Sequence, residues 1–333
     1  MQAYTQRKIS RFFRARTAPT RQQCDRYAAE LTKASNVMPV PVQGDHSYTV
    51  LCTAEDRIEV VSFRVPKYAV SDVDILLAQD VHGDLVPSIT SHSRLGDRVD
   101  GWLHVYQMSY CSGMTLYQIL RLGTEGLGAT KWKHHCFMKE LAKYFARGWR
   151  NPAVMDKQSL ASSEKITRQS LIELSEALYR FPYLRDFVRK LQAKLPTLYS
   201  ADYSQVLIHG DLSLTNVLVE PSTFSISGLV GWSYSSTAPF GYEMGFMRKM
   251  THLFNSDGPD FAYRDDLEKT FWTELFEQMG ITDLSTRSAI RYRAEDAMHV
   301  GLMTSNYLAM KNDGGPLQFM GVNGPGWMEV WLR

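Results

Sequence analysis

Asp211 and Asn216 stand five residues apart in the segment LIHGDLSLTNVLV, residues 207–219. An aspartate on a short loop is suited to accept a proton from a hydroxyl group, and a nearby asparagine can hold a metal ion on reacting phosphates. The apolar run after Asn216 would fix such a loop against a core as a β-strand. The segment therefore predicts a phosphoryl-transfer loop.

The tetrapeptide HGDL also occurs earlier, at residues 82–85. This copy runs into VPSITSH and has no asparagine at the matching distance. We interpret it as the end of a helix followed by a turn, with Gly83 ending the helix.

The elements that must position the loop fall into two kinds along the chain. Residues 20–33 and 71–81 have helical spacing of apolar side chains, whereas residues 38–52, 57–66 and 102–110 are short runs rich in Val and aromatic residues. Gly44 and Asp45 predict a turn between the first two strand-like runs.

After about residue 112 the pattern becomes helical, apart from short β-type runs between 205 and 230. The predicted fold class is α+β. The predicted ranges are an N-terminal basic tail and helix (1–37), a small β-rich N-lobe (38–104) and a larger helical C-lobe (105–333).

A resemblance to a known family becomes plain at HGDLSLTNVLVEPSTFSISGLVGWSYSSTAPFG, residues 209–241. The segment resembles the core of the aminoglycoside phosphotransferase and choline kinase-like family, and within it the fungal branch. Upstream, PVQGDHSYTVLC (41–52) is similar to that branch's β-hairpin over the nucleotide, and VVSFRVP (60–66) to its third strand. The resemblance implies a bilobal, protein-kinase-like fold with a nucleotide cleft between the lobes, and ATP and Mg²⁺ as cofactors.

The resemblance also implies roles for residues of the loop. Asp211 matches the catalytic base and Asn216 matches a metal ligand, while His209 and Gly210 match residues that shape the loop.

Further implied residues belong to the nucleotide-binding part. Arg64 matches the basic residue that touches the α- and β-phosphates, and Gly44 and Ser47 lie in the hairpin over the nucleotide. The family's acid partner of the basic residue would be Asp72 here, although acids at a helix start also stabilise the helix on their own. For Asp45 we expect a side chain that points to solvent at the turn.

One position departs from the family pattern, which places a metal-bridging aspartate directly before the tryptophan. Here Gly231 precedes Trp232, and no Asp or Glu lies between Glu220 and Glu243. Loss of one such electrostatic element costs on the order of 10² to 10³ in rate. We expect Glu243 to stabilise the helix after Pro239 rather than to replace the missing acid.

The substitution leaves three functions open. The protein is a degenerate family member with weak or absent transfer, which signals through a nucleotide or a protein partner. Alternatively it is an active small-molecule O-phosphotransferase that uses Asp211 and Asn216, or its cleft serves a non-kinase role in fungal specialised metabolism. If the rest of the site is intact, Gly231→Asp should raise Mg²⁺-dependent turnover.

The partners that the resemblance implies are a small-molecule substrate or a nucleotide, besides that protein partner. The formal net charge of +2 over 333 residues predicts no nucleic-acid partner, and no apolar run is long enough to predict a membrane span. Four widely spaced cysteines favour a reducing compartment, so we expect a cytoplasmic protein. The first 24 residues hold six Lys or Arg and no acid, which leaves a mitochondrial presequence as the alternative to a basic tail.

Overall fold

The computed structural model describes residues 2–16, 19–97, 101–122, 130–254 and 261–312. Contacts divide the chain into two compact units. Unit 1 comprises Met1–Gly128 with Ser213–Tyr234, and unit 2 comprises Ala129–Leu212 with Ser235–Arg333. The phosphoryl-transfer loop predicted from the sequence therefore contributes Asp211 to unit 2 and Asn216 to unit 1.

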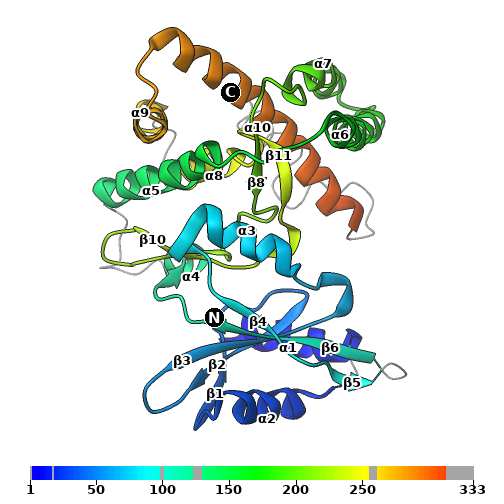
Figure 1. Ribbon diagram of the computed structural model, residues 1–333, viewed down its shortest axis with the longest axis vertical. Coiled ribbons are helices and arrows are strands. Elements are labelled where there is room, and N and C mark those ends of the chain that lie inside the picture. The colour runs from blue at the N-terminus through cyan, green and yellow to red at the C-terminus, as the bar shows by residue number, and fades with distance from the viewer. Residues whose placement is uncertain (1, 17–18, 98–100, 123–129, 255–260, 313–333) are drawn as a thin grey trace. The chain divides into compact units, whose positions relative to one another are not determined.

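Unit 1 combines antiparallel sheets with helices (Figure 1). Its α-helices are α1 (Gln2–Arg16), α2 (Arg21–Thr32), α3 (Asp72–His82) and α4 (Leu116–Leu122). Its short 3₁₀ helices are η1 (Pro66–Tyr68), η2 (Gly83–Leu85) and η3 (Trp232–Tyr234). Its strands are β1 (Asn36–Pro39), β2 (Ser47–Thr53), β3 (Ile58–Arg64), β4 (Ile89–Ser91), β5 (Leu95–Asp97), β6 (Gly101–Ser109), β7 (Met114–Thr115), β9 (Val217–Val219) and β10 (Ile226–Leu229).

The larger sheet has the strand order β1-β2-β3-β6-β4, with β5 also paired to β6. Buried and less buried residues alternate along most of β2, as period-two side-chain geometry requires of a strand with one face on a core. In the smaller sheet, β9 lies between β10 and β7.

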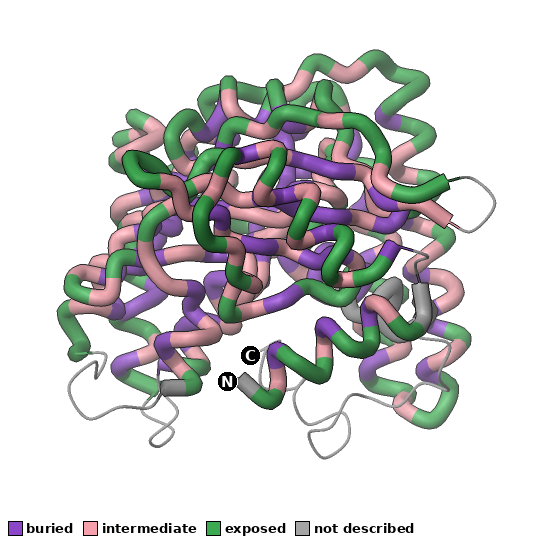
Figure 2. The backbone as a smooth tube through the Cα atoms, turned by 90° about the horizontal axis from the view of Figure 1, so that it is seen from below, coloured by how far each residue is buried: buried purple, intermediate pink, exposed green. Residues whose placement is uncertain are grey.

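Helices α1 and α2 pack against the larger sheet (Figure 1). In the helix beside the N label of Figure 2, buried positions recur every three to four residues among exposed ones, at Thr5, Ile9 and Phe12. Ile9 and Phe12 of α1 are buried in the same core as Val61 and Phe63 of β3. The basic N-terminal segment is therefore a helix that forms part of the core of unit 1.

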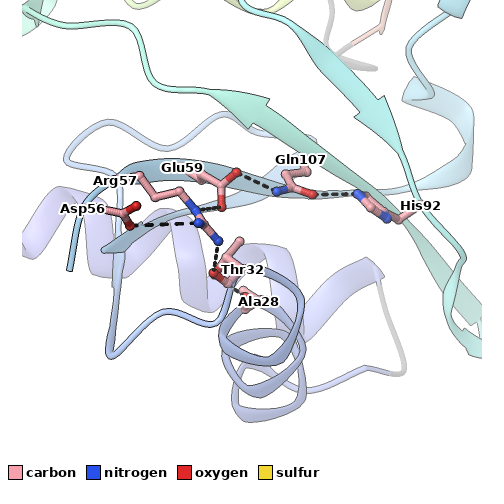
Figure 3. A network of polar contacts seen from close by, with 7 residues as sticks. All are labelled: Ala28, Thr32, Asp56, Arg57, Glu59, His92 and Gln107. Atoms are coloured by element: carbon pink, nitrogen blue, oxygen red, sulfur yellow. Dashed lines mark hydrogen bonds and ion pairs between the residues drawn. The ribbon is translucent and has the colours of Figure 1, made fainter. Parts of the chain in front are cut away.

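A polar network ties α2 to the same sheet (Figure 3). Arg57 donates to the carbonyl oxygen of Thr32 and to Glu59, and Gln107 bridges Glu59 to His92. These contacts involve exposed or half-buried groups, so each adds little stability, but together they fix the end of α2 to β3 and β6.

Unit 2 is mostly helical (Figure 1). Its helices are α5 (Lys131–Arg150), α6 (Lys157–Ala177), α7 (Pro182–Leu198), α8 (Gly245–Leu253), α9 (Phe261–Met279) and α10 (Leu284–Asn312), and its strands are β8 (Gln205–Ile208) and β11 (Ser236–Pro239). β8 and β11 pair in an antiparallel ribbon, and all four residues of β8 are buried.

These elements confirm the α+β class, with most of the strands before residue 116 and most of the long helices after residue 130. The first HGDL copy is the predicted helix end: α3 stops at His82, and Gly83 follows with φ +59°. No helix within the described ranges is long and apolar enough to cross a membrane.

Candidate functional site

The loop that carries Asp211 follows β8 in unit 2. His209 is fully buried, and its ring Nδ1 accepts a hydrogen bond of 3.2 Å from the backbone N–H of Asp211. Gly210 has φ +79°, a conformation that favours glycine, and the Asp211 side chain that follows is exposed. His209 and Gly210 thus turn the chain so that the side chain of Asp211 leaves the core.

Glu243 holds this loop from a turn between β11 and α8. Its carboxylate accepts hydrogen bonds from the backbone N–H groups of His209, at 2.8 Å, and Gly210, at 2.6 Å. Removal from water raises the pKa of Glu243 to about 7, against the opposing effect of the donors. The carboxylate of Glu243 does not cap α8, because that helix has no side-chain cap and the carboxylate binds the loop.

Two further side chains of unit 2 have pKa values that respond to the charges of Glu243 and Asp211. Burial raises the pKa of Tyr144 on α5, and the charge of Glu243 adds to the effect. Burial lowers the pKa of Lys249 on α8, while the charge of Asp211 opposes that shift. Lys249 was not predicted from the sequence, because no local pattern around it shows that α8 places this side chain within the electrostatic influence of Asp211.

Asn216 and Gly231 come together in unit 1 through the β9–β10 pair. Val217 lies opposite Leu229 in the register, and the carbonyl oxygen of Asn216 accepts a hydrogen bond of 2.9 Å from the N–H of Val230. A Cβ added to Gly231 would lie 2.9 Å from Oδ1 of Asn216. The position expected to carry the family's aspartate is therefore adjacent to the predicted metal ligand.

The backbone at Gly231 itself disfavours a side chain. Its φ is +91°, in the region that L-residues rarely adopt. The carboxylate is absent, and the main chain has a conformation in which a carboxylate-bearing residue would be strained.

These residues do not fit the pair of ligands expected for Mg²⁺. Asn216 offers one amide oxygen and Gly231 offers none. Nor does any group of three or more His, Cys, Asp or Glu side chains in the described residues have an arrangement that could hold a metal ion.

Arg64 is at the end of β3, directly opposite Ser47 of β2. Gly44 is close to the same place, since a Cβ there would lie 3.3 Å from Oγ of Ser47. The structure thus brings together Arg64, Gly44 and Ser47, three of the four residues predicted for the nucleotide-binding part. Asp45, next to Gly44, is half-exposed and forms an ion pair of 2.5 Å with Lys8 of α1.

The predicted partner of Arg64 is not the one observed. Its guanidinium Nη1 donates to the hydroxyl of Ser233, and the ion pairs of the described residues include none between Arg64 and Asp72. Asp72 and Asp74 occupy the first turn of α3, where Ser71 caps the backbone N–H of Asp74. The alternative in which these acids stabilise the start of the helix agrees with this geometry.

The model of the Phosphotransferase enzyme family matches residues 78–271, more than half of the chain, so the chain belongs to that family. Its fold is kinase-like, as the resemblance predicted. No curated protein matches significantly.

Several solved structures are similar to this chain. The choline kinase LicA from Streptococcus pneumoniae is 13% identical, with a TM-score of 0.48, over 93% of this chain and 98% of that chain. An aminoglycoside-3'-phosphotransferase of type VIII is 15% identical, with a TM-score of 0.44, over 84% and 100%. Aminoglycoside phosphotransferase APH(3'')-Id from Streptomyces rimosus, in complex with ADP and streptomycin, is 13% identical, with a TM-score of 0.43, over 82% and 97%.

Proposed function

We propose that this chain binds ATP or a related nucleotide but transfers its phosphoryl group to a small-molecule hydroxyl weakly or not at all. The observation that carries the proposal is Gly231, where the metal-bridging acid is missing and the left-handed φ of +91° disfavours any side chain. Without that ligand, charge that develops on the transferring phosphoryl group loses much of its stabilisation.

The chemistry that remains belongs to Asp211. Its exposed carboxylate is placed to accept the proton of an acceptor hydroxyl as the oxygen of that hydroxyl attacks phosphorus. Glu243 holds the two preceding amides, which limits the positions that the Asp211 backbone can adopt. Lys249 supplies a positive charge that favours the ionised form of Asp211.

An active small-molecule O-phosphotransferase is the second candidate. The ordered loop around Asp211 favours it, because two hydrogen bonds to one carboxylate maintain a geometry that an inactive protein does not need. The two candidates differ in rate, since both retain the same base and the same binding residues.

The first test is thermal unfolding of the full chain with ATP, with ATP and Mg²⁺, and with neither. A ligand at 100 times its Kd adds about 2.7 kcal/mol of stability. Stabilisation by ATP that does not require Mg²⁺ is the expected result. No change in thermal stability in either condition would contradict nucleotide binding and would favour the non-kinase role.

The rate test follows ADP release with choline, streptomycin and hygromycin B as probe acceptors. We expect turnover at or below the detection limit, and any turnover that is detected should fall by about 10² to 10⁴ in Asp211→Asn. Asp202→Asn, at an exposed surface aspartate, is the matched control. Fast Mg²⁺-dependent turnover in the wild type would support the active enzyme instead.

A further inference from the structure

Among the residues that the structure describes, no Asp or Glu forms an ion pair with Arg64. Its Nη1 donates to the neutral hydroxyl of Ser233, and its buried Nε has no hydrogen-bond partner among the described residues. The groups that act on it electrostatically are the side chains of Tyr106 and Tyr234, and burial lowers the pKa of Arg64. A guanidinium does not lose its proton near neutral pH, so it remains a cation in need of an anion.

Two nearby positions could have supplied an acid to neutralise the charge of Arg64, and neither does. Gly231 has no carboxylate, and Asp72 is committed to the first turn of α3 without an ion pair to Arg64. A phosphate that approaches Arg64 therefore meets an uncompensated positive charge. Because no carboxylate at these two positions repels the phosphate, a divalent cation is not needed to relieve such a repulsion.

The turn that carries Ser233 is firmly anchored. Trp232 is buried, with its indole N–H donating to the carbonyl oxygen of Leu229 at 2.9 Å. Tyr234 contacts the ring of Tyr68 edge-on, with 6.0 Å between the centroids, and Tyr68 stacks on His46 at 3.6 Å. Ser233 is thus held on the guanidinium by its neighbours.

We propose that the hydroxyl of Ser233 competes with the phosphates of an incoming nucleotide for the guanidinium of Arg64, which the resemblance already implies as their contact, and that this contact needs no divalent cation. Ser233 is then the residue that sets the affinity of unit 1 for polyphosphate. The identity of the ligand as a nucleotide rests on the proposed function, whereas the anion site rests on Arg64 and Ser233 alone.

The test is calorimetric titration of the full chain, in EDTA, with inorganic tripolyphosphate, ATP and adenosine. Ser233→Ala should bind tripolyphosphate and ATP about tenfold more tightly than the wild type, because a charged hydrogen bond is released. Its affinity for adenosine should not change. Ser233→Cys, which keeps the size of the side chain and weakens the acceptor, should shift the affinities in the same direction.

Two controls isolate the guanidinium. The double variant Arg64→Met with Ser233→Ala should lose the gain, and Ser222→Ala, at an exposed serine, should behave as the wild type. Unchanged tripolyphosphate affinity in both Ser233 variants, or ATP binding that requires Mg²⁺, would overturn the proposal.

The outcomes also separate this proposal from the proposed function. A gain for tripolyphosphate in protein that binds neither ATP nor adenosine would support the anion site and refute nucleotide binding. ATP binding that is equal in the wild type and both Ser233 variants would support nucleotide binding and refute the role of Ser233.

Discussion

The carboxylate of Glu243 accepts a hydrogen bond of 2.6 Å from the backbone N–H of Gly210, 33 residues earlier in the chain. The same carboxylate accepts from His209. A buried acid that binds two amides of one loop couples the charge of that acid to the position of the residue that follows, Asp211.

This coupling predicts a pH dependence of stability. The pKa of Glu243 rises from 4.5 to about 7 on folding, so between these values the folded state binds more protons than the unfolded state. The contribution of Glu243 to stability is therefore complete below pH 4.5 and is lost as the pH rises through 7, by roughly 3 kcal/mol.

Chemical denaturation of the wild type and Glu243→Gln between pH 5 and 8 would measure this effect. The difference in unfolding free energy between the two proteins should change across the range, whereas Glu30→Gln, at an exposed residue of α2, should follow the wild type. Parallel curves for the wild type and Glu243→Gln would contradict the prediction.

Gly231 gives a second prediction, which differs from the one that the sequence alone supports. A side chain at φ +91° that also meets Asn216 at 2.9 Å is strained. Gly231→Ala and Gly231→Asp should both lose about 1–2 kcal/mol of stability. Gly231→Ala is the matched control, because it places a Cβ on the same strained backbone. Gly231→Asp should show no more Mg²⁺-dependent turnover than Gly231→Ala. A clear gain in the aspartate variant would show that the carboxylate reaches a metal position after all.

The contrast at Gly231 shows what the sequence could and could not predict. The order of strands and helices, and the strands on either side of Asp211 and Asn216, follow from local apolar patterns and glycine turns. The backbone conformation at residue 231 depends on the β9–β10 register and on the packing of Trp232, which no local pattern encodes.

The same limit applies to partners that are distant in the chain. Acids at a helix start favour the helix dipole, which agrees with the position of Asp72 but does not predict that the carboxylate of Glu243 binds a loop. Glu243 faces amides of a loop more than thirty residues away, and Arg64 bonds to Ser233 across 169 residues. The roles of Asp211, Asn216 and Arg64 in catalysis, and the sequence-based domain ranges, stay predictions.

Lys249 gives a third prediction. Because burial lowers its pKa, the folded state holds this proton less tightly than the unfolded state, so charged Lys249 costs stability at neutral pH. Lys249→Met should raise the free energy of unfolding at pH 7 by about 1 kcal/mol, and the gain should shrink as the pH rises toward 10. Lys249→Met should also lower the rate of any phosphoryl transfer that depends on Asp211.

The control for Lys249 is Lys139→Met, at an exposed position of α5. This variant should change stability by less than about 0.5 kcal/mol. A loss of stability in Lys249→Met at pH 7 would mean that the electrostatic attraction between Lys249 and Asp211 outweighs the cost of burial.

Helix α1 gives the last prediction, which concerns the basic N-terminal segment. Phe12 is 2% exposed and lies edge-on to Phe13, whose ring contacts Tyr48 of β2 at 5.0 Å. Phe12→Ala should therefore lose about 3–5 kcal/mol, as expected for a large aromatic residue removed from a core. Arg11→Ala, one residue away on the exposed side, should change stability by less than about 0.5 kcal/mol. Equal stability of the two variants in urea denaturation would mean that α1 contributes nothing to unit 1, as expected of a removable presequence.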